Sequence, residues 1–186
     1  SENRQTVKAG IQFLIQMHIG FVFLVAAFLV AAIATGESIG FASLENYFSA
    51  NRVFPLFLLF FAGFGIKAGF IPLHTWLPHA HPAAPSHVSG IMSGVIIKMG
   101  IYGIMRILTF VHTGLPEIGI FLLIVSFISG VLGVTLAIVQ HDIKKLLAYH
   151  SIENIGIIGM GIGVGVIGMA TGNQTLTVLG FAGGFL

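Results

Sequence analysis

Five long apolar runs occupy most of this chain of 186 residues and constrain its fold more than any other feature. An α-helix needs about 20 apolar residues to cross the hydrocarbon core of a bilayer. The runs that meet this requirement are Ile11–Ala34, Val53–Ile71, His87–Val111, Pro116–Val139 and Leu146–Thr171. The sequence therefore predicts an all-α polytopic membrane protein with about five transmembrane helices, in a single domain over residues 1–186.

Composition supports the membrane assignment and excludes several other classes. Only 8% of the residues are charged, whereas soluble domains carry roughly 25%. The chain has no cysteine, so disulfides, iron–sulfur clusters and thiolate zinc sites are excluded within it. A formal net charge of +2 is too small to indicate nucleic-acid binding.

The two ends of the sequence suggest a piece of a longer protein. There is no initial methionine, and a sixth apolar run begins near Leu176 but stops at Leu186, after about half the length of a span. We expect a middle section of a larger membrane protein.

Positive charges predict the orientation of the helices in the membrane. Arg4 and Lys8 precede the first run, and Lys144 and Lys145 lie between the fourth and fifth runs. Counted along five spans, both clusters fall on the same side, which the positive-inside rule places in the cytoplasm. The sequence therefore predicts an integral protein whose N-terminus is cytoplasmic.

A cluster of prolines interrupts the region between the second and third runs. Pro72, Pro78, Pro82 and Pro85 make a continuous helix there improbable, since proline lacks an N–H donor and clashes with the preceding turn. Broken helices at membrane depth mark ion sites in transporters, because the freed backbone groups require protein or water partners. An ordinary cytoplasmic loop remains the alternative.

Two lysines lie inside apolar runs on either side of this break. Lys67 is near the end of the second run and Lys98 is near the middle of the third. A lysine at the centre of a membrane helix costs about 2.5–3.5 kcal/mol on insertion scales, so such residues usually have a function or a buried partner. For Lys67, snorkelling to the interface is the alternative. Two ammonium groups on neighbouring helices destabilise one another, which favours the passage of a proton between them.

Other polar residues near the break are candidates for a proton path. His74, His79, His81 and His87 lie in or beside the proline cluster, but their spacing matches no recognised set of metal ligands, and we expect no metal. In the fifth run, His150 and Glu153 share one helical face with Asn154. Trp76 fits an aromatic anchor at the membrane interface.

Two long stretches of the sequence carry a family resemblance. "GFGIKAGFIPLHTWLPHAHPAAPSHVSGIMSGVIIKMGIYGIMRIL" and "QHDIKKLLAYHSIENIGIIGMGIG" resemble the antiporter-like membrane subunits of the respiratory complex I superfamily. "HPAAPSHVSGIMSGVIIKMGIYGI" and "HSIENIGII" are most similar to the hydrogenase branch, component B of the formate hydrogenlyase-type group-four hydrogenases. His79 stands where the NADH:quinone oxidoreductase branch usually has aspartate.

The resemblance implies a bundle of about fourteen helices built from two inverted repeats of five helices. The five runs here would be helices six to ten of that bundle, followed by the start of helix eleven. The key lysine of the broken seventh helix falls on Lys67, and the lysine or histidine of the eighth helix falls on Lys98. The family's glutamate on helix five would precede Ser1, and its charged residue on helix twelve would follow Leu186.

The resemblance also implies a function. The chain would be a proton-translocating subunit of a membrane-bound oxidoreductase of the hydrogenase or NADH:quinone oxidoreductase type, in the cytoplasmic membrane of a prokaryote. We expect no redox cofactor in this chain, so electrons would pass through a peripheral arm, reached by way of other membrane subunits. The alternatives are a subunit of a multisubunit Na⁺/H⁺ antiporter, a histidine-rich membrane metalloenzyme, and a structural anchor.

Overall fold

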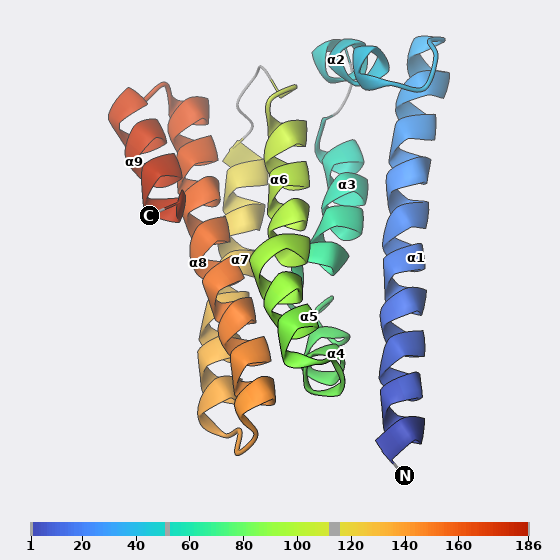
Figure 1. Ribbon diagram of the computed structural model, residues 1–186. Helices are drawn as coiled ribbons and strands as arrows, with labels where there is room; N and C mark the ends of the chain where they lie inside the picture. Colours follow the sequence, from blue (N-terminus) through green and yellow to red (C-terminus); the bar gives the residue numbers. More distant parts are fainter. Residues whose placement is uncertain (1, 51–52, 112–115, 186) are drawn as a thin grey trace.

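The computed structural model describes residues 2–50, 53–111 and 116–185, and every regular element within these ranges is helical. The helices stand side by side in a bundle, with the exception of α2, which lies across the end at the top of Figure 1. In chain order the elements are α1 (Glu2–Thr35), α2 (Phe41–Ala50), α3 (Val53–Ala68), α4 (Leu77–Ala83), α5 (Ser86–Ile91), the π-helical turn η1 (Met92–Ile96), α6 (Ile97–Leu108), α7 (Pro116–Ile138), α8 (Ile143–Thr171) and α9 (Gln174–Phe185).

The long apolar helices follow the predicted spans closely, with one shortened. Among the described residues, four helical stretches are long and apolar enough to cross a membrane, namely Arg4–Thr35, Ser86–Leu108, Pro116–Ile138 and Ile143–Thr171. The second predicted span, Val53–Ile71, is a helix of only 16 residues that ends at Ala68. The sequence also did not indicate α2, which lies in the segment that joins α1 to α3.

The end of α3 explains why the second span is short. Gly69 has a φ of 84°, a left-handed conformation that glycine adopts at little cost and that terminates a helix. The amides of Gly69 and Phe70 both donate to the carbonyl of Gly65, which caps the last turn. The chain then passes through turns to α4, so the predicted break near Pro72–Pro85 is confirmed, and it begins three residues before Pro72.

Helices α7, α8 and α9 pack with their backbones close together. A Cβ atom added at Gly156 of α8 would lie 2.4 Å from the amide nitrogen of Gly130 on α7. One added at Gly180 of α9 would lie 2.4 Å from the amide nitrogen of Gly165. Small residues allow this close approach, which stabilises helix pairs in lipid through van der Waals contact.

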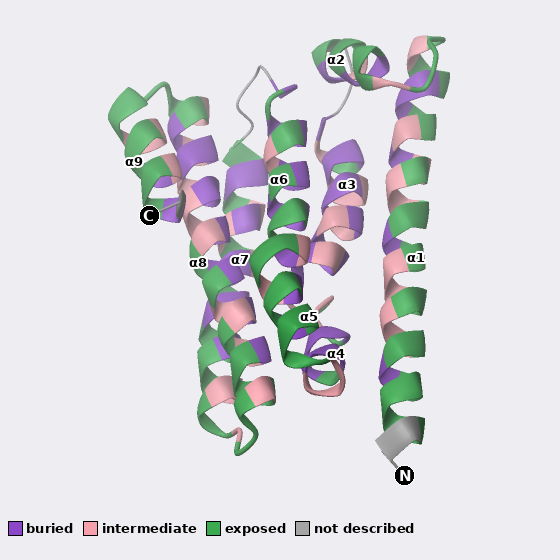
Figure 2. Cartoon of the chain, in the orientation of Figure 1, coloured by how far each residue is buried: buried purple, intermediate pink, exposed green. Residues whose placement is uncertain are grey.

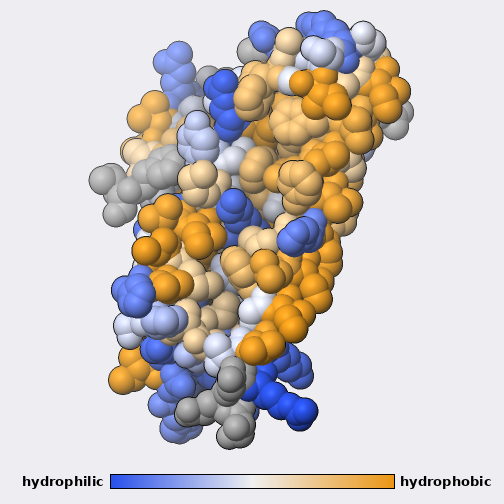
Figure 3. All heavy atoms as spheres, turned by 45° about the vertical axis from the view of Figure 1, so that its right-hand side comes forward, coloured by the Kyte–Doolittle hydropathy of each residue, from blue (hydrophilic) through white to orange (hydrophobic). Residues whose placement is uncertain are grey.

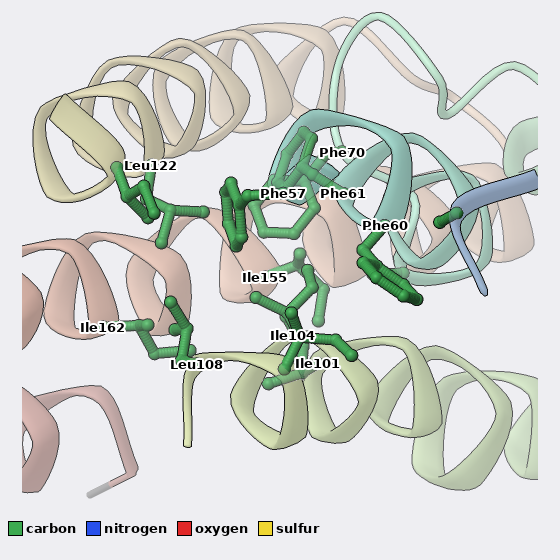
Figure 4. Packing of buried hydrophobic residues seen from close by; sticks show 14 of the residues in the cluster. Phe57, Phe60, Phe61, Phe70, Ile101, Ile104, Leu108, Leu122, Ile155 and Ile162 are labelled. Carbon is green, nitrogen blue, oxygen red and sulfur yellow. The ribbon is translucent and has the colours of Figure 1, made fainter. Parts of the chain in front are cut away.

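Aromatic side chains fill the space where α3, the break and α7 meet. Figure 4 shows Phe57, Phe61 and Phe70 gathered beside α8 residue Ile155. The rings of Phe61 and Phe70 have centroids 5.3 Å apart, and Phe121 of α7 lies 4.9 Å from Phe61. This cluster holds the end of the broken helix against the α7–α8 pair.

The outward faces of the long helices are apolar. Exposed positions run along almost the whole of α1 in Figure 2, and they include Phe21, Val22 and Ile33. In Figure 3 the hydrophobic side chains form a long band along one side, while hydrophilic ones gather near both ends. This distribution suits a protein surrounded by lipid or by other membrane helices.

Candidate functional site

The break after α3 is held in place by hydrogen bonds to its freed backbone groups. The indole N–H of Trp76 donates to the carbonyl oxygen of Ile66 at 2.7 Å, and the amide of Ile71 donates to Ser129 Oγ on α7 at 3.0 Å. Gln16 of α1 donates to the hydroxyl of Thr75. The expectation that Trp76 is an interfacial anchor is therefore wrong, because its side chain is fully buried and bonds to the last turn of the broken helix.

Lys67 lies in that last turn of α3, partly buried. The carbonyl end of a helix dipole stabilises a positive charge at this position. Its side chain lines a cleft of about 350 Å³ between α1, α3 and the α5–α6 helix, with Phe13, Met17, Val95, Ile96 and Met99 among the other lining residues. Within the described residues, no hydrogen bond or ion pair involves the Lys67 ammonium.

Lys98 lines a different cleft. It is the second residue of α6, directly after the π-helical turn η1, and π-helical turns are frequent at functional sites because they displace the register of the helix. The cleft has a volume of about 770 Å³ and is lined by Lys98, Tyr102 and Met105 of α6, by Asn154 and Ile157 of α8, and by Gly183 and Gly184 of α9. No carboxylate of the described part of the chain pairs with Lys98.

The two lysine-bearing helices touch at the level of the lysines. A Cβ atom added at Gly100 would lie 2.6 Å from the amide nitrogen of Ala68 and 2.7 Å from the carbonyl oxygen of Phe64. Ala68 follows Lys67 directly, and Gly100 is two residues after Lys98. The two clefts nevertheless share no lining residue, so the two lysines do not line one common cleft.

His81 is the one histidine of the break that is almost completely buried, with 1% of its surface exposed. Its Nδ1 lies 2.6 Å from Ser89 Oγ, and its Nε2 lies 3.2 Å from Ser93 Oγ. Ser93 Oγ in turn lies 3.2 Å from Ser151 Oγ on α8. A continuous chain of one imidazole and three hydroxyls therefore connects α4, α5, η1 and α8.

Charge and burial both keep His81 neutral. His81 is on α4, between the apolar stretches Val53–Ala68 and Ser86–Leu108. Burial, and then the positive charge of Lys144, lower the pKa of His81. The Lys144 ammonium itself donates to the carbonyl oxygen of Ala84 at 2.8 Å. A neutral imidazole donates from one ring nitrogen and accepts at the other, so it can relay a proton between hydroxyls by exchanging tautomers.

The other histidines of the break do not join this chain. His74 is partly buried, and its Nδ1 has no hydrogen-bond partner among the described residues. His79 is exposed, with Nδ1 2.9 Å from the Thr75 carbonyl oxygen, and His87 is exposed on α5. In the described part of the chain, no three histidine or carboxylate side chains gather as metal ligands do.

His150 and Glu153 form a pair on α8. His150 Nδ1 lies 2.6 Å from Glu153 Oε2, so the imidazole donates to the carboxylate. Asn154, on the same face of α8, reaches the cleft of Lys98, whereas neither member of the pair lines it. Of the three polar residues predicted on this face of α8, Asn154 is the one that lines the cleft of Lys98.

A scan against protein families matches residues 1–182 to the transmembrane family of NADH:quinone oxidoreductase and Mrp antiporter subunits. The chain belongs to this family. Hydrogenase-4 component B of Escherichia coli K12 is 42% identical over 186 residues, which cover 98% of this chain. Formate hydrogenlyase subunit 3 of the same organism is 42% identical over 129 residues, or 69% of this chain.

A solved structure shows the same fold. One chain of the Mrp complex from Dietzia sp. DQ12-45-1b superposes with a TM-score of 0.76 at 24% sequence identity, and the match covers 96% of this chain and 35% of that one. The present chain spans 28% of the length of hydrogenase-4 component B and 21% of formate hydrogenlyase subunit 3. The family assignment makes it an integral membrane protein.

Within this family fold, several polar residues of the site were not predicted from the sequence. Only the hydrogen bonds in the structure identify four serines as part of the site, namely Ser89, Ser93, Ser129 and Ser151. One signal was available: Ser89 and Ser93 are four residues apart in a helix, so they share a face. The partner across that face, His81, lies on α4, and the interruption at Ala84 and Pro85 separates it from Ser89 on α5. Local periodicity does not extend across such an interruption, so it does not predict this contact.

Proposed function

We propose that this chain handles protons within an antiporter-like subunit of a membrane oxidoreductase of the hydrogenase type. The observation that carries the proposal is the pair of membrane lysines, Lys67 and Lys98, on helices that touch at the level of the helix break. Each lysine lines its own cleft. Neither ammonium group has an ion-pair or hydrogen-bond partner among the described residues. An unpaired lysine in such a place can take up and release a proton.

The hydrogen-bonded chain of His81, Ser93 and Ser151 would supply a route for protons from the cytoplasmic end towards Lys98. His81 would take a proton beside Lys144 and pass it through Ser93 to Ser151. Ser93 precedes Lys98 by five residues, roughly 7.5 Å of helix rise, so water in the cleft would complete the connection. His150 and Glu153 would hydrate or extend this path from α8, and the partly buried His74 and the exposed His79 and His87 would serve the entrance.

The proposal includes partners and an orientation. Hydrogenase-4 component B and formate hydrogenlyase subunit 3 are named as parts of larger assemblies. By analogy, this chain would contact other membrane subunits, and a peripheral redox arm would drive it. The N-terminus would face the cytoplasm of a prokaryote, since Arg4, Lys8, Lys144 and Lys145 precede or begin helices at one end of the bundle.

The test is proton translocation by the full chain in its native assembly, reconstituted into liposomes that contain a pH-sensitive dye. We expect Lys67→Ala and Lys98→Ala each to lower the translocation rate by roughly 100-fold, the scale of a lost acid–base group. The control is Arg106→Gln, which removes a cation from the same helix as Lys98. The Arg106 guanidinium lies over the Phe41 and Phe110 rings, away from both clefts.

Undiminished translocation in both lysine variants would support the structural-anchor alternative and contradict the proposal. In a second experiment with the same liposomes, a sodium gradient replaces the redox substrate as the driving force. Translocation driven by sodium without a redox partner would instead favour a multisubunit Na⁺/H⁺ antiporter, whose fold this chain shares.

A further inference from the structure

A large polar hollow lies at the end of the bundle where α1 begins. It has a volume of about 790 Å³, and three separate segments form its walls: the first turns of α1, helix α4, and the start of α8. The polar side chains that line it are Gln5, Thr6, Lys8, Gln12, His79, Asp142 and Lys145. We call this hollow the basal pocket. It is distinct from the clefts of Lys67 and Lys98, with which it shares no residue.

The basal pocket carries an excess of positive charge. Lys8 and Lys145 are both exposed, and in the described residues neither ammonium has an ion-pair partner. Asp142 brings one negative charge to the pocket, against two positive charges from Lys8 and Lys145. Its Oδ1 accepts hydrogen bonds from the amides of Lys144 and Lys145 as the N-cap of α8. Lys144 is bonded to the Ala84 carbonyl oxygen, so Lys145 is the α8 cation that remains available to the pocket.

Neutral groups add hydrogen-bond donors around the two lysines. The amides of Gln5 and Gln12 lie on the same face of α1 as Lys8, and Gln12 Nε2 already donates one hydrogen to the Thr75 carbonyl oxygen at 3.4 Å. His79 adds no donor, because its Nδ1–H donates to the same carbonyl and the Nε2 of a neutral imidazole then only accepts. Cations and amide donors that converge from several segments are the groups that bind a phosphate oxygen.

The depth of the pocket in the membrane indicates that a bound phosphate would belong to a lipid headgroup. Lys8 comes three residues before Ile11, where the apolar run of α1 begins, and Lys145 is the third residue of α8. Both cations therefore lie at the level of the lipid headgroups, where anionic lipids of the cytoplasmic leaflet concentrate. Val7 and Ile11, exposed on the same turns of α1, offer apolar surface beside the pocket for an acyl chain.

We propose that the basal pocket binds the phosphate headgroup of an anionic phospholipid, held by Lys8 and Lys145. This inference rests on the proposed orientation in the membrane, but it does not depend on the proposed proton transfer. A lipid in this place would join α1 to α4 and α8 at the cytoplasmic end, and would hold α1 against the segment that follows the helix break.

The test is native mass spectrometry of the full chain in its membrane assembly, titrated in detergent with phosphatidylglycerol or with phosphatidylcholine. We expect phosphatidylglycerol, which is anionic, to bind more tightly than phosphatidylcholine. A lysine near the membrane surface strengthens attraction to anionic lipid roughly fivefold, so Lys8→Gln and Lys145→Gln should each weaken binding by about that factor. The double variant should weaken it by roughly 25-fold. The double Lys→Arg variant should bind phosphatidylglycerol as the unchanged protein does.

Arg4→Gln is the matched control, because Arg4 is an exposed cation on the same end of α1 that does not line the pocket. It should change binding by less than about twofold. Equal binding by the unchanged protein and the double glutamine variant would overturn the proposal, as would an equal loss in Arg4→Gln. Displacement of the lipid by millimolar inorganic phosphate would overturn the lipid assignment in favour of free phosphate at the same residues.

Discussion

At the scale of single residues, Ser93 is the link on which the proposed path depends. Its hydroxyl lies 3.2 Å from both His81 Nε2 and Ser151 Oγ, so Ser93→Ala removes the only atom that joins them in the described structure. We expect proton translocation to fall several-fold, because water must then bridge a wider gap. Ser93→Thr keeps the hydroxyl and should retain most of the rate. The measurement is dye-reported translocation in liposomes.

The serine control is Ser49→Ala on α2. Ser49 Oγ donates only to the Glu45 carbonyl oxygen in its own helix, so its loss should leave the rate unchanged. If Ser93→Ala and Ser49→Ala behave alike, His81 does not pass protons through Ser93.

At the scale of helices, the contact between α3 and α6 determines where both lysines lie. Gly100→Ala would place a methyl group 2.6 Å from the amide nitrogen of Ala68, so α3 and α6 must separate. Overpacking of this kind costs about 1–3 kcal/mol. We expect a lower thermal midpoint and slower proton translocation. Both would be measured on the purified assembly, by a thermal-shift assay and by the liposome assay.

Gly90→Ala is the corresponding control, since nothing lies within 4 Å of a Cβ atom at Gly90 on α5. It should be neutral or slightly stabilising, because alanine favours a helix by about 1 kcal/mol over glycine. A thermal midpoint that falls equally in both variants would mean that the α3–α6 contact has no special role.

At the scale of the whole molecule, the end that carries the basal pocket should face the cytoplasm. The chain has no cysteine, so single substitutions report which side a residue occupies. We expect His141→Cys, between α7 and α8, to react with a membrane-impermeant maleimide only from the cytoplasmic side. Ser38→Cys, between α1 and α2, should react only from the opposite side, and Val25→Cys, within α1, from neither. Labelling is read by gel shift in right-side-out and inverted vesicles, and the reversed pattern would contradict the orientation.

The main features of the fold could be predicted from the sequence because they depend on local properties. Hydropathy along the chain predicted the four long helices, since lipid requires a continuous apolar run whatever the neighbours are. Proline predicted the break after α3, because a proline inside a long helix removes a hydrogen bond and clashes with the preceding turn, although Pro78 and Pro82 do lie within the short helix α4. Only the starting point of the break differed, since Gly69 terminates α3 before Pro72 is reached.

The candidate site was only partly predictable. Lys67 and Lys98 stand out in sequence because charge in an apolar run is rare and costly. The sequence did not indicate that they line separate clefts, because the direction of a side chain depends on how each helix is rotated against its neighbours. That rotation follows from close glycine contacts such as Gly100 on Ala68, and sequence alone does not distinguish Gly100 from Gly90, which has open space beside it.

The sequence by itself determined that this chain spans a membrane, where its helix breaks and which charges lie inside the apolar runs. Only the tertiary structure decided that His81 forms hydrogen bonds with Ser89 and Ser93. The same is true of the hydrogen bond from Trp76 to the Ile66 carbonyl oxygen in the last turn of α3. It also placed Lys8 and Lys145 in the lining of one pocket. Solvation and backbone sterics depend on each residue and its neighbours in sequence, so their effects can be predicted from the sequence. Contacts across a helix break or between separate helices depend instead on how the helices pack.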